Sequence, residues 1–296
     1  MSKLNPKLFS KDVEQVPIRQ GYGEGLLEAG KKDKRVVALC ADLTDSTKTG
    51  IFSDKFPERF VQMGVAEQSM ASVASGMAAM GKIPFIASYA MFSPGRNWEQ
   101  IRTTICYNNA NVKIAGAHAG VSVGPDGGTH QAIEDMAIMR VLPNMIVLSP
   151  CDMVEARKAT IAAARAQSPV YIRFHREKTP IITTNDTPFE IGKAQIFFDS
   201  SQDGGKPDVS LIATGPLVHN ALLAADALTK LGKKVRVINS PSVKPLDEAT
   251  ILAAAVDSGA LVTIEEHQIA GGMGSAIAEL LTRHKPVPIE FVGVHN

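Results

Sequence analysis

The chain of 296 residues has few cysteines, few aromatic residues and almost no net charge. Its three cysteines, Cys40, Cys106 and Cys151, lie far apart and form no Cys-x-x-Cys pair, which disfavours a disulfide framework or a zinc site. We therefore predict a reduced, cytoplasmic protein. The 31 basic and 30 acidic residues give a formal charge of +1, so binding to nucleic acid or to an anionic membrane through bulk charge is not expected.

Long apolar runs are also missing. The most apolar stretch, residues 70–80, is interrupted by serine and glycine before it reaches the roughly 20 residues that a membrane-spanning helix needs. The first six residues contain no apolar core of a signal peptide, which again favours the cytoplasm. With 45% hydrophobic and 21% charged residues, the composition is that of a folded globular protein, and the length predicts about two domains.

Short β-branched runs alternate with longer segments of helical spacing over the first 177 residues. This alternation predicts an α/β domain, in which a parallel sheet carries helices on both faces. The expected strands are residues 36–40, 84–87, 112–115, 145–148 and 170–172. The expected helices are residues 20–29, 67–80, 97–108, 131–140 and 152–166.

The alternation stops after Glu177 and resumes near residue 190. Residues 178–189 include two prolines and no sustained helical period, so we predict a linker there between a domain of residues 1–177 and one of residues 190–296. The second domain is smaller and again reads as α/β. Its expected strands are residues 209–213, 235–238, 261–264 and 289–292, and its expected helices are residues 217–231, 248–256 and 274–281.

Polar and aromatic residues gather just after the predicted strands of the first domain. In an open parallel sheet this edge binds ligands, because the carboxyl ends of the strands all lie there. The residues concerned are Asp42, Ser46, Glu67, Tyr89, Phe92, His118, Asp126 and His130. We therefore predict the functional site at this edge of the sheet.

Several of these residues also have an ordinary structural interpretation. Glu67 suits the first turn of a helix, where the helix dipole favours an acidic residue, but that helix is almost free of charge, a setting in which a carboxylate can hold or relay a proton. Asp126 is followed by two glycines and suits any tight turn. Tyr89 and Phe92 fit either a core position or a stacking surface.

Two histidines flank the glycine-rich loop. His118 and His130 can meet a substrate from two sides, as hydrogen-bond donors or as acid and base. Their spacing matches no usual pair of zinc ligands, so a zinc site is disfavoured. Arg19, before the first helix, and Arg176, at the end of the run Arg173-Phe174-His175-Arg176, predict bidentate binding of an anion such as phosphate, with solvated surface side chains as the alternative.

Several motifs together resemble the transketolase family. The match to its pyrimidine-binding domain rests on Met63-Gly64-Val65-Ala66-Glu67-Gln68, Tyr89-Ala90-Met91-Phe92, His118-Ala119-Gly120, Asp126-Gly127-Gly128-Thr129-His130-Gln131 and Leu142-Pro143-Asn144-Met145. The run Glu265-Glu266-His267-Gln268-Ile269-Ala270-Gly271-Gly272-Met273-Gly274 resembles the start of a helix in its C-terminal domain. The motifs span nearly the whole chain in the order of the family. The resemblance implies a pyrimidine-binding domain followed by a smaller α/β C-terminal domain.

The resemblance also implies a cofactor, thiamine diphosphate, and a role for each matching residue. Glu67 would hydrogen-bond the aminopyrimidine ring and promote deprotonation of the thiazolium carbon. Phe92 would stack on the pyrimidine beside Tyr89, and Asp42 would lie near the cofactor across the subunit boundary. The implied substrate contacts are His118 and His130 to the sugar hydroxyls and the developing carbinol, Asp126 to the hydroxyl next to the carbonyl, and Arg19, Ser46 and Arg176 to the phosphate of the acceptor sugar.

The sequence departs from the family where the cofactor's diphosphate would bind. Transketolases hold the diphosphate and Mg²⁺ through a Gly-Asp-Gly motif in a separate N-terminal domain, and no Gly-Asp-Gly occurs in this sequence. The resemblance therefore implies the C-terminal subunit of a split transketolase, with no metal site of its own. An N-terminal partner subunit would bind the diphosphate and Mg²⁺, giving an α2β2 heterotetramer. In addition, Gly95 stands where the family has an aromatic residue, which puts one wall of the pyrimidine pocket in question.

Two other functions are open. The chain could be the β subunit of another thiamine diphosphate enzyme, of the 2-oxoacid dehydrogenase or 1-deoxyxylulose-5-phosphate synthase type. Gln131 after the second histidine and the set of possible phosphate contacts favour a transketolase, with the pentose phosphate pathway as the default role. The chain could also be a non-catalytic regulatory α/β subunit, although the residues expected to carry the chemistry are all present. The substrate sugars are not determined by the sequence.

Overall fold

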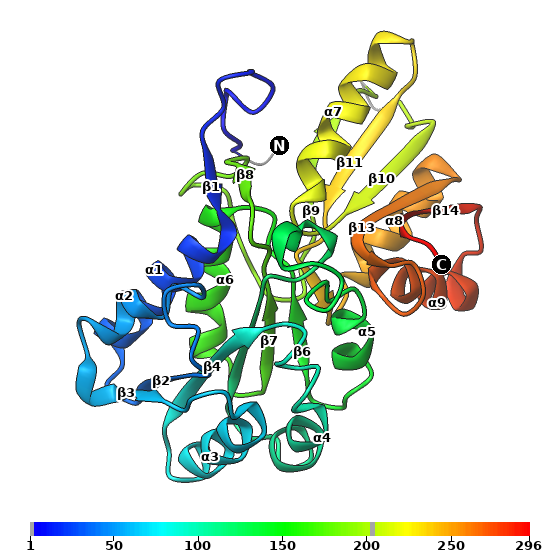
Figure 1. Cartoon of the computed structure of the whole chain (residues 1–296). Helices are drawn as coiled ribbons and strands as arrows, with labels where there is room; N and C mark the ends of the chain where they lie inside the picture. Colours follow the sequence, from blue (N-terminus) through cyan, green and yellow to red (C-terminus); the bar gives the residue numbers. More distant parts are fainter. Residues whose placement is uncertain (1–2, 202–204) are drawn as a thin grey trace.

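The computed structural model describes residues 3–201 and 205–296. It contains two large sheets of mostly parallel strands, each between layers of helices, and a small two-stranded sheet (Figure 1). The predicted α/β class is therefore confirmed. No helix in the described part of the chain combines the length and the apolarity needed to cross a bilayer. The three cysteines are buried and unpaired.

The first sheet has seven strands in the order β12-β6-β7-β5-β4-β2-β3. Six of them are parallel: β2 (Val36–Cys40), β3 (Phe60–Gln62), β4 (Ile83–Tyr89), β5 (Lys113–Ala117), β6 (Ile146–Leu148) and β7 (Val170–Arg173). The seventh, β12 (Ser242–Lys244), comes from the second half of the chain and pairs antiparallel with β6. The first sheet is thus completed by a strand from beyond the predicted linker.

Helices cover both faces of this sheet because successive residues of a strand point to opposite sides. Val36, Ala38 and Cys40 pack with α1 (Ile18–Lys32) and α6 (Met153–Arg165). Val37 and Leu39 face the other side, which is covered by α3 (Glu67–Ala79), η2 (Ile101–Cys106) and α5 (Asp135–Arg140). The shorter helical segments are α2 (Gly50–Ser53), η1 (Pro57–Arg59), α4 (Trp98–Gln100) and η3 (Val121–Asp126).

Glycines allow α1 and α6 to approach closely. A Cβ atom on Gly21 would lie 1.9 Å from the carbonyl oxygen of Met153, and one on Gly25 would lie 2.7 Å from that of Arg157. Any larger residue at these two positions would collide with the backbone of α6. The close contact fixes α1, which carries Arg19, against the sheet.

The second sheet has the order β14-β13-β10-β11-β9. Within the part of this sheet that the structure describes, β9 pairs antiparallel with β11 and the other pairs are parallel. Its strands are β9 (Gln195–Asp199), β10 (Val209–Ala213), β11 (Val235–Asn239), β13 (Leu261–Gln268) and β14 (Ile289–Val294). Helix α7 (Leu217–Lys230) covers one face, and α8 (Glu248–Ser258) and α9 (Met273–His284) cover the other.

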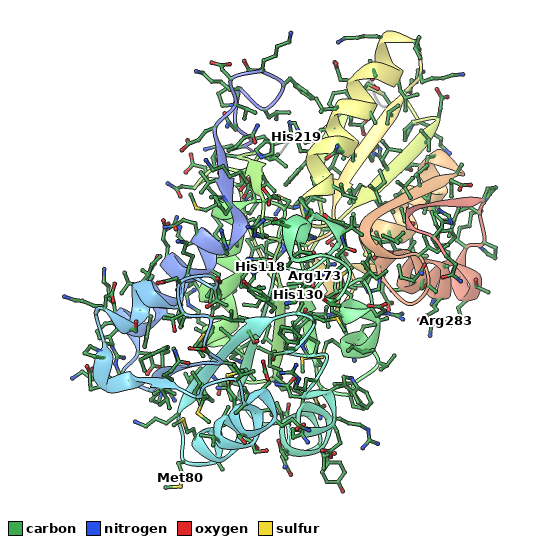
Figure 2. All side chains as sticks on the ribbon, in the orientation of Figure 1. Met80, His118, His130, Arg173, His219 and Arg283 are labelled. Atoms are coloured by element: carbon green, nitrogen blue, oxygen red, sulfur yellow. The ribbon has the colours of Figure 1, made fainter. Side chains whose placement is uncertain are left out.

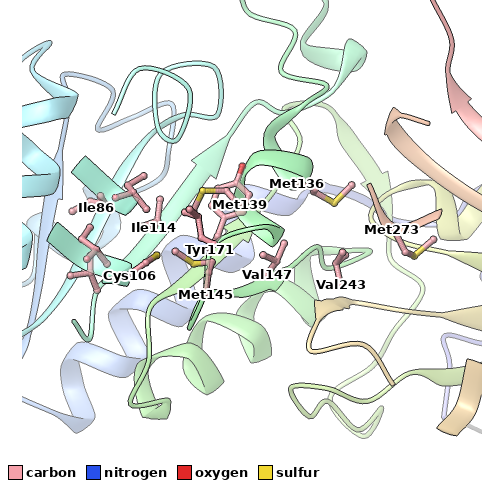
Figure 3. Packing of buried hydrophobic residues seen from close by; sticks show 14 of the residues in the cluster. Ile86, Cys106, Ile114, Met136, Met139, Met145, Val147, Tyr171, Val243 and Met273 are labelled. Atoms are coloured by element: carbon pink, nitrogen blue, oxygen red, sulfur yellow. The ribbon is translucent and has the colours of Figure 1, made fainter. Parts of the chain in front are cut away.

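The two sheets share one apolar core. A continuous cluster runs from Met136 and Met139 of α5 through Val147 and Val243 to Met273 at the start of α9 (Figure 3). Val243 belongs to β12, the strand that the second half of the chain adds to the first sheet. The second domain is therefore packed on the first through buried side chains.

The segment predicted as a linker, residues 178–189, begins with a strand. This strand, β8 (Lys178–Pro180), pairs antiparallel with β1 (Gln15–Pro17). The carboxylate of Asp152 then accepts the backbone N–H groups of Ile182 (2.8 Å) and Thr183 (2.6 Å). The segment is thus tied to the first domain, and the limits of the two domains stay predictions.

The predicted helix over residues 131–140 was too long, because α5 begins only at Asp135. The carbonyl oxygen of Ala132 accepts the N–H of Gly120 (2.7 Å), and Ala132 also forms a β-bridge with Ala119. These backbone groups close the loop of residues 119–131, so they are not available for a helix. The predicted helix over residues 97–108 is instead a short α4 followed by the π-helix η2.

Candidate active site

Glu67 is a buried carboxylate at the first position of α3, with only 1% of its surface exposed. Its Oε2 lies 2.8 Å from Nη1 of Arg96, whose positive charge compensates the buried negative charge. Its Oε1 has a longer contact, 3.4 Å, with the hydroxyl of Ser88 on β4. Asn97 donates to the backbone carbonyl of Glu67 and fixes the start of the helix. Oε1 is consequently the weakly bonded oxygen of this carboxylate.

An aromatic surface lies beside this carboxylate. The rings of Tyr89 and Phe92 are nearly parallel, with centroids 6.3 Å apart and planes 20° apart. The guanidinium of Arg96 lies 4.6 Å from the centroid of Phe92, a cation–π contact. Arg96 therefore joins Glu67 to the aromatic pair. Sequence reasoning missed Arg96, although a basic residue four positions after a candidate stacking aromatic was a usable signal.

Gly95 leaves one side of this surface without an aromatic wall. A Cβ atom on Gly95 would lie 1.9 Å from the carbonyl oxygen of Met91. With this backbone no side chain fits at position 95, so the departure from the family noted in the sequence reflects a tight turn after Phe92. The candidate site is bounded there by backbone alone.

His118 lies directly after β5 with 1% of its surface exposed. Its Nε2 is 3.0 Å from Nη1 of Arg19, and its ring centroid is 4.0 Å from that of Tyr89. A guanidinium can only donate, so Nε2 accepts and the ring proton is assigned to Nδ1. Nδ1 has no hydrogen-bond partner among the described residues. The ring thus presents one buried donor that no described residue satisfies.

The electrostatic surroundings keep His118 neutral. Burial, followed by the positive charges of Arg19 and Arg176 and by His130, lowers the pKa of His118 to about 3. The ring is therefore uncharged at neutral pH. This state suits a hydrogen-bond donor through Nδ1–H, and it does not supply an imidazolium acid.

Arg19 and Arg176 carry like charges that act on each other at the His118 end of the site. Arg19 also donates to the backbone carbonyl of Ser46 (3.0 Å). Burial, and then the nearby charge of Arg176, lower the pKa of Arg19. Arg176 donates to the carbonyl of Val123 and pairs with Glu177 at 3.0 Å. A bound anion would relieve the repulsion between the two guanidinium groups.

His130 closes the loop over the aromatic surface. Its ring meets Phe92 edge-on, with centroids 5.3 Å apart and planes 83° apart, and its Nδ1 is 2.9 Å from the hydroxyl of Thr129. Its centroid also lies 6.1 Å from that of Tyr89. Figure 2 shows His118 and His130 in the middle of the molecule, far from His219 and Arg283 of the second domain.

The structure thus connects most of the predicted site residues. One contact network contains Glu67, Tyr89, Phe92, His118, His130, Arg19 and Ser46, and the charge of Arg176 acts on Arg19 and His118. Asp42 and Asp126 are exposed, and within residues 3–201 and 205–296 no hydrogen bond or ion pair joins their carboxylates to this network. Asp42 has a left-handed backbone (φ 58°), and its N–H donates to the side chain of Gln62.

The residues of the basic run that ends in Arg176 differ in burial. Arg173 and His175 are each 1% exposed and belong to the interior, where Arg173 pairs with Asp135 at 2.8 Å. Arg176, by contrast, is partly exposed. The sequence alone did not separate the two arginines, because the burial of Arg173 comes from tertiary contacts with Asp135 and with Glu266 of the second domain.

We predict that the His118 ring does not titrate between pH 5 and pH 8. Because burial, the charges of Arg19 and Arg176, and His130 oppose the imidazolium, the ring should be half-protonated only near pH 3. The measurement is the ring ¹⁵N chemical shifts of ¹⁵N-histidine-labelled protein, with the signal assigned from the H118N variant. A titration midpoint near the ordinary value of about 6.5 would contradict this account of the site.

Comparison with known proteins matches both halves of the chain. Residues 14–181 match the family model described as transketolase, pyrimidine binding domain, and residues 200–296 match that described as transketolase, C-terminal domain. A 6-deoxy-6-sulfo-D-fructose transketolase subunit from Clostridium sp. (strain MSTE9) is 40% identical over 97% of this chain and 88% of its own. An apulose-4-phosphate transketolase subunit from Phocaeicola vulgatus is 34% identical over 94% of this chain and 88% of its own.

A solved structure is similar over almost the same span. It is described as a split gene transketolase, inactive beta4 tetramer, and it superposes with a TM-score of 0.87 at 43% identity, covering 96% of this chain and 90% of that one. Fold, domain order and sequence therefore agree. The chain belongs to the transketolase family, among its split C-terminal subunits.

Proposed function

We propose that this chain is the C-terminal subunit of a two-component transketolase, which transfers a two-carbon ketol unit from a ketose phosphate to an aldose phosphate. The observation that carries the proposal is the buried Glu67 carboxylate beside the stacked Tyr89 and Phe92 rings. The family implies thiamine diphosphate, which supplies the carbon nucleophile and the electron sink for this reaction when it is bound. The chain's own residues would bind the pyrimidine ring, orient the cofactor and hold a proton at Glu67.

The residues present fit the pyrimidine half of this cofactor. Oε1 of Glu67 has only a long contact with Ser88, so it is the atom to accept a hydrogen bond from a ring nitrogen and to hold the proton there. Phe92, with Tyr89 beside it, offers a flat apolar surface on which a heteroaromatic ring can stack. Arg96 keeps the carboxylate charge compensated in the buried site.

The diphosphate half needs residues from elsewhere. In the described part of the chain, no group of three or more His, Cys, Asp or Glu side chains is placed to hold a metal ion. We propose that an N-terminal partner subunit supplies the diphosphate and Mg²⁺ contacts in an α2β2 assembly, with Asp42 near the cofactor at the subunit boundary. A relative described as an inactive tetramer of beta chains supports the need for such a partner. The unpaired buried cysteines support a cytoplasmic location.

The sugar end of the site suits a substrate with a terminal anionic group. Arg19 and Arg176 place two positive charges together, and the backbone of Ser46 orients the first. Nδ1–H of His118 would donate to a sugar oxygen, while His130 and the exposed Asp126 would contact neighbouring hydroxyls. Of the two relatives compared above, the first is named for a sulfonated sugar and the second for a phosphorylated sugar. Pentose phosphates are therefore one candidate class of substrate. Their names also favour a transketolase over a decarboxylating thiamine enzyme or a non-catalytic subunit.

Replacing Glu67 by glutamine should lower ketol transfer by the reconstituted complex by about 10²- to 10⁴-fold, because the amide cannot take up the proton. Assembly, followed by sedimentation velocity, should be unchanged because the shape of the side chain is kept. E99Q, which alters an exposed carboxylate on α4, is the matched control and should retain full activity. Full turnover in E67Q would refute the proton role. Decarboxylation of pyruvate without ketol transfer by the wild-type complex would refute the proposed reaction.

The R176A variant should raise KM for phosphorylated or sulfonated acceptors by about 10- to 100-fold and leave kcat nearly unchanged. The reason is the loss of a charge-assisted hydrogen bond that binds ground state and transition state alike. Steady-state kinetics with a phosphorylated aldose and with its unphosphorylated counterpart measure this, since only the former should be affected. R165A, on the exposed end of α6, is the control. A fall in kcat at constant KM would contradict the anion-binding role.

A further inference from the structure

We propose that Glu266, in the second domain, is a positioning residue for the loop of residues 119–131, which carries Asp126 and His130. The inference rests on the proposed function, because it assumes that this loop meets the sugar. Glu266 lies on β13 and does not itself belong to the contact network of the candidate site. Its influence would act through the backbone of the loop.

The Glu266 carboxylate is in direct contact with the start of the loop. Its Oε1 accepts the backbone N–H of Ser122 at 2.7 Å, and the residue is 9% exposed. At Gly120 the backbone is left-handed (φ 84°), and a Cβ atom there would lie 2.3 Å from the same oxygen. The carboxylate therefore packs on the loop with no space between them.

The end of the loop is tied to the same residue through Arg173. The Nη2 of Arg173 donates to the backbone carbonyls of Glu266 (2.7 Å) and Ala132 (3.4 Å). Its Nε pairs with Asp135 at 2.8 Å, at the first residue of α5. One residue after Ala132, the carbonyl of Ile133 accepts the N–H of Gln268, which is also on β13. Both ends of the loop are thus held against the end of one strand of the second domain.

Burial makes the charges of Arg173, Asp135 and Glu266 costly to leave unpaired. Arg173 is 1% exposed and lies between the carboxylate of Asp135 and the backbone of Glu266. The second carboxylate oxygen of Glu266, Oε2, is 3.3 Å from Nε2 of His175, and that nitrogen is also 2.9 Å from Nη1 of Arg173. Burial and then Arg173 hold the pKa of His175 well below its usual range, so that ring is neutral. Because Nε2 of the neutral ring accepts from Arg173, it has no proton to donate to Glu266, and the hydrogen bond that holds the Glu266 carboxylate is the one from Ser122.

Few other hydrogen bonds join the loop to the rest of the described chain. Among the described residues, the hydrogen bonds that join residues 121–131 to parts of the chain outside residues 119–132 are Ser122 to Glu266 and Val123 to Arg176. The remaining bonds of this stretch are local, including Gln131 to the carbonyl of Val121. Removal of the Glu266 carboxylate should consequently loosen the segment that carries Asp126 and His130, while the aromatic surface and Glu67 stay in place.

The test compares E266A, E266Q and E266D in the reconstituted holoenzyme. E266A should raise KM for the sugar substrates about 10- to 100-fold and change kcat by no more than about threefold. E266Q should behave almost as the wild type, because the amide oxygen can still accept the N–H of Ser122. E266D keeps the charge but withdraws the oxygen by one methylene, so it should be intermediate. E290A, which removes an exposed carboxylate on β14, is the control.

A second measurement does not depend on activity. Hydrogen–deuterium exchange of this chain should show faster exchange for peptides covering residues 119–131 in E266A than in the wild type or E266Q, with unchanged exchange in α3. Wild-type KM together with wild-type loop exchange in E266A would overturn the proposal. If E266A does not fold, wild-type KM and loop exchange in folded E266D would overturn it instead. A wild-type complex with no ketol transfer would refute the proposed function, and the exchange comparison would still decide whether Glu266 holds the loop.

Discussion

Parallel pairing of the strands in the first sheet is the constraint on which the rest of the site depends. In the observed register Cys40 pairs with Ala87, Tyr89 with Ala117, and Gly116 with Arg173. Residues that follow these pairs must lie along one edge of the sheet, whatever their distance in the sequence. Tyr89 and His118 are therefore neighbours because β4 and β5 are neighbours. The loops that follow the strands then supply the side chains around them.

Burial of charge determines how these side chains can act. Glu67 is tolerated in the interior because Arg96 pairs with it, and Arg173 is tolerated because Asp135 does the same. Burial, and then the positive charges of Arg19 and Arg176, keep His118 neutral. The site is thus divided into an end with one compensated carboxylate and an aromatic surface, and an end with two nearby arginines. This division fits a neutral heteroaromatic ring at one end and an anionic group at the other.

Much of the fold was predictable from the sequence because buried strands and amphipathic helices carry strong periodic signals. The run at residues 36–40 coincides with β2, and residues 209–213 coincide with β10. The three-residue strands β1, β3, β8 and β12 were missed, because such short segments show little period and β12 pairs with β6 only through the folded chain. The five-residue edge strand β9 was missed as well. The helix predicted from residue 131 was too long because the backbone of Ala132 bonds to the loop instead.

The candidate site was predictable to the extent that its residues follow strands. That argument, with the family resemblance, located Glu67, Tyr89, Phe92, His118 and His130, and the contacts now connect them. It could not locate Arg96 as the partner of Glu67, nor Glu266 as the partner of the loop, because each contact joins residues that are distant in the sequence. It also treated Arg173 and Arg176 as one cluster, whereas tertiary packing buries only the first. Proximity in three dimensions was the missing information in each case.

We propose that this chain supplies the pyrimidine half of a cofactor site and that a partner supplies the other half. Isothermal titration calorimetry with thiamine diphosphate and Mg²⁺ tests it most directly, first with this chain alone and then with an N-terminal transketolase subunit that carries the Gly-Asp-Gly motif. We expect tight binding only in the mixture. Tight binding by this chain alone, or no binding in the mixture, would contradict it.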